Sequence, residues 1–234
     1  MRPTLIAALL CIATVALPRA HGQQTEALRK QFLEYKVKAE KGDAEAQSKL
    51  GSSYFVGEGV ETNLVEAVRW LRKAADQNHP EAQYRLGYAF REGSGVLLDD
   101  SEAFKWFGRS AAQEFAKGEY ALGACYFEGR GVAKNQTEGL KWMRRAAERG
   151  EVGAQSALGA ALANGLGIAA DAGEGVKWLR KAADQNQADA QFNLALCYRD
   201  GLGVATDLAE SVKWLRKASD QNYSDAQASL GECY

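Results

Sequence analysis

The chain has 234 residues, is 46% hydrophobic and carries a formal net charge of −1. These values are ordinary for a soluble globular protein. A charge so close to neutral argues against nucleic acid or an anionic membrane surface as the main partner.

The first residues have the pattern of a secretory signal peptide. Arg2 precedes an apolar run from Leu5 to Leu17, and Pro18 and a cluster of small residues follow. The run is too short to be a stable bilayer anchor. We therefore expect residues 1–22 to be a signal peptide that is cut after Gly22, which leaves a mature chain without a membrane span in the periplasm or outside the cell. The alternative is an apolar N-terminal helix that is retained.

The segment 23–42 has the periodicity of a single helix. Its apolar residues recur at helical spacing: Ala27, Leu28, Phe32, Tyr35 and Ala39. The segment ends in KAEKGDAEAQ, which resembles the KAADQNHPEAQ that begins at Lys73. We expect this helix to cap the N-terminal end of the array that follows.

From Asp43 onward the sequence repeats every 36 residues. All five tryptophans are separated by this interval: Trp70, Trp106, Trp142, Trp178 and Trp214. A leucine column that begins at Leu50 has the same period. A self-similar period of this length is typical of stacked repeats, in which stability comes from neighbours packing on neighbours. We expect an array over 43–234, with whole units at 43–78, 79–114, 115–150, 151–186 and 187–222 and a partial unit at 223–234.

Each unit contains the signals for two helices. In the first unit, the face formed by Ala46, Leu50 and Tyr54 has helical spacing, and a glycine ends the helix in the left-handed conformation. An Asn or Asp three residues before a Glu then opens the second helix in every unit, as expected for an N-terminal cap. Trp70 and Leu71 on that helix are expected to fill the gap to the following unit.

The combined pattern A-x-x-x-L-G-x-x-Y-x-x-G-x-G-V-x-x-[DN]-x-x-E-[AGS]-x-x-W-[LFM]-x-[KR]-[AS]-[AS] resembles the Sel1-like repeat, a relative of the tetratricopeptide repeat. The resemblance covers roughly Asp43 to the end. It implies an all-α fold, a right-handed α/α solenoid of 36-residue helical hairpins, and a non-enzymatic adaptor for protein assemblies. Three departures are expected to loosen individual seams: Lys117-Gly118-Glu119, Leu162 and Ala195.

Some cysteine-rich exported relatives are described as binding or hydrolysing β-lactams, with two cysteines in each repeat. Here Cys125, Cys197 and Cys233 fall in one column, at most one in each unit, and Cys11 belongs to the leader. Equivalent points on stacked helices lie about 8–10 Å or more apart, beyond the roughly 7 Å that a disulfide allows between Cα atoms. We expect free, buried thiols; the alternative is a redox pair.

The sequence stops at Tyr234, in the tyrosine column and before the glycine loop of its unit. A partial helix of this kind caps an array poorly. The expectation is a fragment of a longer array, and the alternative is an end that docks on another molecule.

No pattern points to catalysis, a metal or a cofactor. His21 and His79 are the only histidines, too few for a multi-histidine metal site, and His79 is expected to be a solvent-exposed turn residue. The Asp/Glu pairs recur in phase with the repeat, which capping explains and catalysis does not. We therefore expect no enzyme.

The first helices are expected to line a partner-binding surface. An advance of 100° per residue from Leu50 places Glu45, Ser48, Ser52 and Phe55 opposite the core. The candidate partner-binding residues in these columns are Phe55, Tyr84, Tyr88, Arg91, Tyr120, Phe127, Phe192, Leu196 and Arg199. Aromatic and arginine side chains are typical of binding hot spots. Alternatively, several of them pack against the second helix of the neighbouring unit.

The fourth unit is bare on this surface, with Ser156, Ala160 and Ala163, so we expect a break in the contact surface there. The predicted function is an exported scaffold that holds an extended or helical segment of a partner protein. Three alternatives remain: an array that acts only as a spacer, a binder of cell-wall carbohydrate, because aromatic stripes also stack on sugars, and a cysteine-poor relative of the β-lactam-binding proteins.

Overall fold

The computed structural model describes the backbone of residues 13–231 and the side chains of residues 25–231. The described residues form twelve helices and no strand, which confirms the all-α prediction. Their bounds are α1 Ala13–Glu40, α2 Ala44–Val56, α3 Leu64–Asp76, α4 Pro80–Glu92, α5 Asp100–Ala112, α6 Ala116–Glu128, α7 Gln136–Glu148, α8 Val152–Asn164, α9 Ala172–Asp184, α10 Ala188–Asp200, α11 Leu208–Ser219 and α12 Ser224–Gly231.

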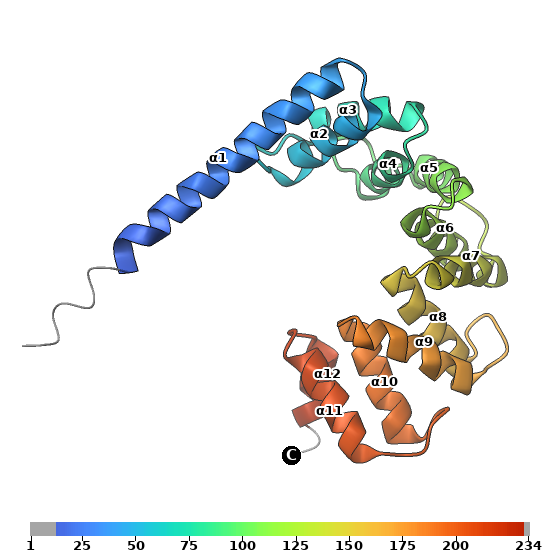
Figure 1. Ribbon diagram of the computed structural model, residues 1–234. Helices are drawn as coiled ribbons and strands as arrows, with labels where there is room; N and C mark the ends of the chain where they lie inside the picture. The colour runs from blue at the N-terminus through green and yellow to red at the C-terminus, as the bar shows by residue number, and fades with distance from the viewer. Residues whose placement is uncertain (1–12, 232–234) are drawn as a thin grey trace, which may run out of the picture. The chain divides into compact units, whose positions relative to one another are not determined.

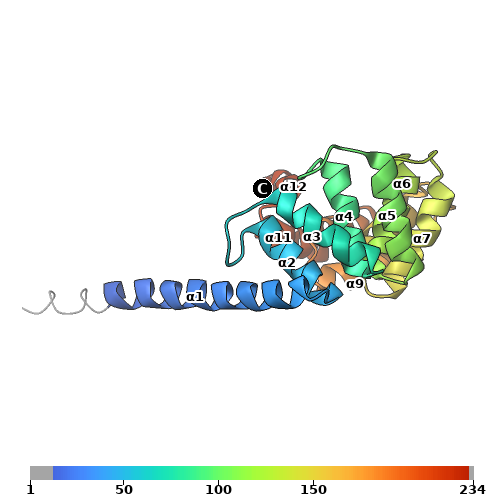
Figure 2. The same cartoon turned by 90° about the horizontal axis from the view of Figure 1, so that it is seen from above.

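The helices belong to two compact units, α1–α4 in an N-terminal unit and α5–α12 in a C-terminal unit. Within the C-terminal unit, each helix packs against the next one in the chain (Figure 1). Within the N-terminal unit, α2 packs against α1 and α3, and α3 against α4 (Figure 2). The whole predicted signal peptide, residues 1–22, lies outside the part of the chain whose side chains are described.

Backbone capping sets the ends of both helices in each repeat. The first helices α2, α4, α6, α8 and α10 all end at a glycine in the left-handed conformation. At the start of α3, the N–H of Glu66 donates to Asn63 Oδ1 over 3.0 Å, and α5, α7, α9 and α11 begin in the same way. The predicted capping role of the Asn/Asp–Glu pairs is therefore confirmed.

The second glycine of the loop serves close packing between repeats. A Cβ atom on Gly95 would overlap the carbonyl oxygen of Leu64, the first residue of the preceding second helix. Gly59 meets Leu28 of α1 in the same way. The C-terminal part of α1 therefore takes the place of a second helix: it packs against the first repeat as a second helix packs against the repeat that follows it.

Trp70 and Trp178 face the preceding repeat, which corrects the expectation for Trp70. Trp70 shares a buried cluster with Phe32 and Ala39 of α1, and Trp178 shares one with Leu140 and Met143 of α7. The neighbouring leucine column faces forward as expected, because Leu179 clusters with residues of α10. The repeat therefore uses its largest side chain on one seam and a leucine on the other.

A column of buried glutamines joins consecutive repeats. The side-chain amide of Gln47 donates to the carbonyl of Ala39 over 3.1 Å, and its oxygen accepts from Gln77 Nε2 over 2.8 Å. Gln155 and Gln191 are held by the same pair of bonds. Glutamine at this position satisfies a helix-end carbonyl inside the seam, where an unpaired polar group is costly.

Two of the three departures from the repeat pattern, Lys117-Gly118-Glu119 and Leu162, are accommodated by local contacts. Glu119 replaces the glutamine and is fully buried, but it forms ion pairs with Arg145 and Arg149 at 3.0 and 3.1 Å. Ser110 stands where other repeats have alanine, and a Cβ on Gly118 would overlap it. The Leu162 side chain is buried in the tyrosine column.

Candidate partner-binding site

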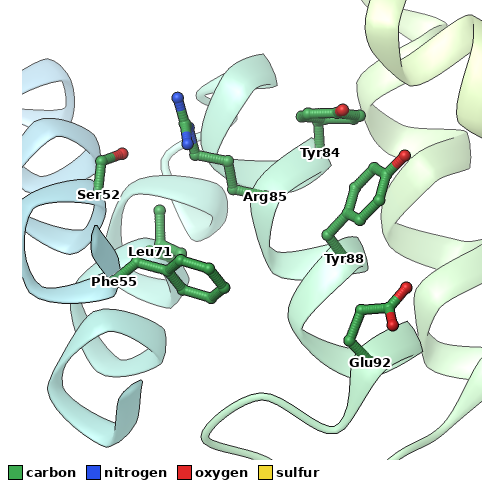
Figure 3. Close-up of a pocket in the computed structure, with 7 residues that line it drawn as sticks. All are labelled: Ser52, Phe55, Leu71, Tyr84, Arg85, Tyr88 and Glu92. Carbon is green, nitrogen blue, oxygen red and sulfur yellow. The ribbon is translucent and has the colours of Figure 1, made fainter. Parts of the chain in front are cut away.

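The N-terminal unit contains a hollow between the first helices α2 and α4. It measures about 370 Å³ and is lined by Ser52, Phe55, Leu71, Tyr84, Arg85, Tyr88 and Glu92, which we call the aromatic hollow. In Figure 3, Ser52 and Phe55 project from α2 on one side and Tyr84, Arg85 and Tyr88 from α4 on the other. Leu71 of α3 lies between them, as the apolar floor.

The aromatic rings of the hollow are held in place by their neighbours. The rings of Tyr84 and Tyr88 meet edge to face, with centroids 4.8 Å apart. The Arg91 guanidinium lies 3.9 Å from the centroid of the Tyr88 ring and also pairs with Glu92 at 2.9 Å. Phe55 is 36% exposed, so its ring is accessible. Ordered aromatic side chains at an open apolar hollow suit the capture of an apolar side chain.

The charged rim of the hollow is internally paired. Arg85 donates from Nε and Nη2 to Oε1 of Glu81, at 3.0 and 2.7 Å. Burial alone would raise the pKa of Glu81, but the hydrogen bond and the positive charge of Arg85 outweigh it, so the pKa is lowered. The rim therefore adds little net charge to the apolar floor.

A second hollow occupies the equivalent place three repeats later, between α8 and α10. It measures only about 90 Å³, and six of its lining residues match aromatic-hollow positions: Ala160, Ala163, Leu179, Asn193, Leu196 and Asp200. We call it the small hollow. With alanines at the Ser52 and Phe55 positions, α8 and α10 pack close to each other. The aromatic side chains of α2 and α4 thus create a space that smaller side chains close.

The structure separates the nine predicted site residues into groups. Phe55, Tyr84 and Tyr88 line the aromatic hollow, and Arg91 stacks on Tyr88. Tyr120 and Phe127 are half-buried against the core of α7 and α8. Phe192 packs on the core of α9–α11, Leu196 lines the small hollow, and the exposed Arg199 pairs with Asp200 at 2.7 Å. Tyr120, Phe127 and Phe192 thus have packing roles.

Some expectations about exposure were wrong. Ser48, Ser156 and Ala163 are buried, because the first helices contact neighbours on a wider face than the angular projection assumed. His79 is the N-cap of α4 rather than an exposed turn residue, and its side chain is only 14% exposed. The sequence analysis also missed Arg85, although its column varies along the chain as much as those that were considered.

Other chemistry has no support in the described residues. Cys125 and Cys197 are buried and form no disulfide, and burial raises the pKa of the Cys197 thiol. The described part of the chain contains no group of three or more potential metal ligands of the His, Cys, Asp or Glu type. None of its helices is both long and apolar enough to span a membrane.

Comparison with known proteins places the chain among repeat proteins. The Sel1 repeat model matches five consecutive segments: 44–79, 80–115, 116–151, 152–187 and 188–223. No curated protein sequence gives a significant match. A Sel1 repeat protein from Oxalobacter formigenes is 31% identical, with a TM-score of 0.77 over 88% of this chain and 60% of its own.

Two further solved structures are similar. A protective antigen of uropathogenic Escherichia coli with an SLR fold is 31% identical, with a TM-score of 0.66 over 86% of this chain and 51% of its own. A Sel1 repeat protein from Klebsiella pneumoniae subsp. pneumoniae shares the fold, with 18% identity, a TM-score of 0.57 and coverage of 85% of this chain and 97% of its own. The chain therefore spans 60% and 51% of the two more similar proteins. With five matched repeats that cover more than half of its sequence, the chain belongs to the Sel1 repeat family.

Proposed function

We propose that this protein is an exported scaffold that holds a segment of a partner protein on the surface formed by the first helices of its repeats. Sel1 repeat proteins generally mediate protein–protein interactions, and the family is generally non-enzymatic. The observation that carries the proposal is the aromatic hollow, with Phe55, Tyr84 and Tyr88 around an apolar floor. One large apolar side chain of the partner would enter it.

Adjacent residues of α2 provide a matched test of this site. Phe55→Glu would place a charge inside the hollow, whereas Val56→Glu would place the same charge at a residue that is 64% exposed and does not line it. The partner should be captured by wild type and by Val56→Glu, and at least tenfold more weakly by Phe55→Glu. Both variants must keep wild-type helical circular dichroism. Equal capture by both variants would rule out the hollow as the anchor.

Export is a separate part of the proposal, supported by the apolar run from Leu5 to Leu17 and the small residues before Gly22. The N-terminal sequence of the protein recovered from its native host should begin at Gln23. A protein that still begins at Met1 in the cytoplasm would contradict export but would leave the binding site untouched.

The other candidate activities gain no support. Neither the hollow nor the similar structures favour a cell-wall glycan as partner. The described repeats carry at most one cysteine each, in no disulfide, which does not match the paired cysteines of the β-lactam-binding relatives.

A further inference from the structure

We propose that His79 is a pH-sensitive bridge between the two walls of the aromatic hollow. His79 directly precedes α4, which supplies Tyr84, Arg85 and Tyr88. Its partner Glu45 lies in the first turn of α2, which supplies Ser52 and Phe55. The effect on partner binding rests on the proposed function, whereas the bridge itself does not.

Both ring nitrogens of His79 are engaged. The backbone N–H of Ala82 donates to Nδ1 over 3.2 Å, and Nε2 lies 2.7 Å from Oε2 of Glu45. A backbone N–H can only donate, so Nδ1 must present its lone pair. The ring proton then sits on Nε2 and is donated to the Glu45 carboxylate. This geometry requires a neutral imidazole and an ionised carboxylate.

The residue at the same position in the preceding repeat is Asp43, so the two N-caps differ in the kind of acceptor atom that they provide. Asp43 caps α2 by accepting the N–H of Ala46 over 2.7 Å. A carboxylate remains an acceptor throughout the range from pH 5 to 8, whereas histidine side chains titrate within it. Of these two caps, only the one on α4 uses an acceptor atom that protonation converts into a donor.

Protonation would break one of the two bonds and keep the other. A proton on Nδ1 turns that atom into a donor that faces the N–H of Ala82, at a helix N-terminus where positive charge is unfavourable. The bond to Glu45 persists, because the hydrogen bond from His79, and to a smaller extent the charge of Lys49, lower the pKa of Glu45. The ring stays with α2 and releases α4.

The released turn is connected to the rim of the hollow. Glu81 lies in the first turn of α4 and holds Arg85, which lines the hollow. On the facing helix α2 the charged groups are Glu45, which bonds the ring, and Lys49, which interacts with Glu45. Glu81 in the first turn of α4 and Asp76 at the end of α3 flank His79 in the sequence. Acidification should therefore loosen the first turn of α4 and, with it, one wall of the hollow.

Nuclear magnetic resonance of the full chain between pH 8 and pH 5 tests the bridge without any partner. At pH 8 the ring should be the Nε2–H tautomer. The Ala82 amide signal should shift with the same midpoint as the ring, and its hydrogen exchange should become about fivefold faster relative to that of Ala46. Ala46 itself should not report this titration. A ring protonated on Nδ1 at pH 8, or an Ala82 amide that ignores the ring titration, would overturn the bridge.

The control variant is His79→Asn, which keeps a neutral capping acceptor and removes the titration. Its Ala82 amide should be independent of pH over this range, and His21 cannot replace the lost signal. Once a partner is known, wild type should bind it about threefold or more weakly at pH 5.5 than at pH 7.5, and His79→Asn should not. Equal pH dependence in both proteins would exclude regulation through His79. Equal capture by Phe55→Glu and Val56→Glu would reject only the hollow as the binding site. It would leave the His79 bridge untouched, because the Ala82 amide is measured without a ligand.

Discussion

Single glycines decide how closely the helices of this chain approach each other. A Cβ atom on Gly175 of α9 would lie 2.7 Å from the backbone nitrogen of Ala163 in α8, and one on Gly51 would lie 2.8 Å from Leu71 Cγ. Real Cβ atoms do not come so close to other heavy atoms. The small residues that recur in the sequence are therefore explained by contact between helices rather than by flexibility.

Two glycines in the C-terminal unit should respond to alanine in opposite ways. Gly131 has φ of +68°, and its Cβ would overlap the carbonyl oxygen of Asp100, so Gly131→Ala should destabilise the protein by about 2 kcal/mol. Gly108 lies inside α5 with nothing within 4 Å of an added Cβ, so Gly108→Ala should stabilise by about 0.5–1 kcal/mol. Urea denaturation measures both. A Gly131→Ala protein as stable as wild type would refute the close approach.

At the scale of the element, the capping signals in the sequence predicted where helices begin and end. Asn63 and Gly57 mark the start of α3 and the end of α2, and the same signals recur in later repeats. These signals are local, because a cap bonds to a backbone group only a few residues away. The partner of Glu119 could not be predicted in this way, because Arg145 and Arg149 lie on another helix.

The ion pairs of Glu119 with Arg145 and Arg149 should be replaceable by the glutamine–glutamine hydrogen bond that other repeats have at this position. Glu119→Gln alone should destabilise the protein by about 1–3 kcal/mol, because it leaves Arg149 and Arg145 without their carboxylate. Adding Arg149→Gln should recover part of the loss, since the two glutamines can form the bond seen between Gln47 and Gln77. A double-mutant cycle by denaturation measures the coupling. Strictly additive effects would show that the two positions do not interact.

At the scale of the whole molecule, each repeat is stabilised by its immediate neighbours. Phe32 of α1 is buried, with its ring 5.3 Å from that of Tyr54 in α2, and it belongs to the cluster that includes Trp70. Contacts of this kind link one repeat to the next, so a defect should weaken with distance along the array.

Phe32→Ala should therefore have a local effect. We expect a loss of about 3 kcal/mol in the stability of the N-terminal unit, with faster hydrogen exchange in α2 and α3 and unchanged exchange in α9–α11. Leu33→Ala is the control, because Leu33 is 51% exposed and should leave exchange unchanged. Uniform loss of protection across all helices would instead mean that the array unfolds as one cooperative body.

The sequence by itself determined the period, the two helices of each repeat and their caps, because these depend on hydrogen bonds and burial patterns among nearby residues. The tertiary structure decided which candidates line a site. Phe55, Tyr84 and Tyr88 enclose a hollow, while the similar residues Tyr120 and Phe127 pack into the core. The physical reason is that the space between two first helices depends on the combined size of side chains from three helices. One repeat position, compared along the sequence, does not give that combined size.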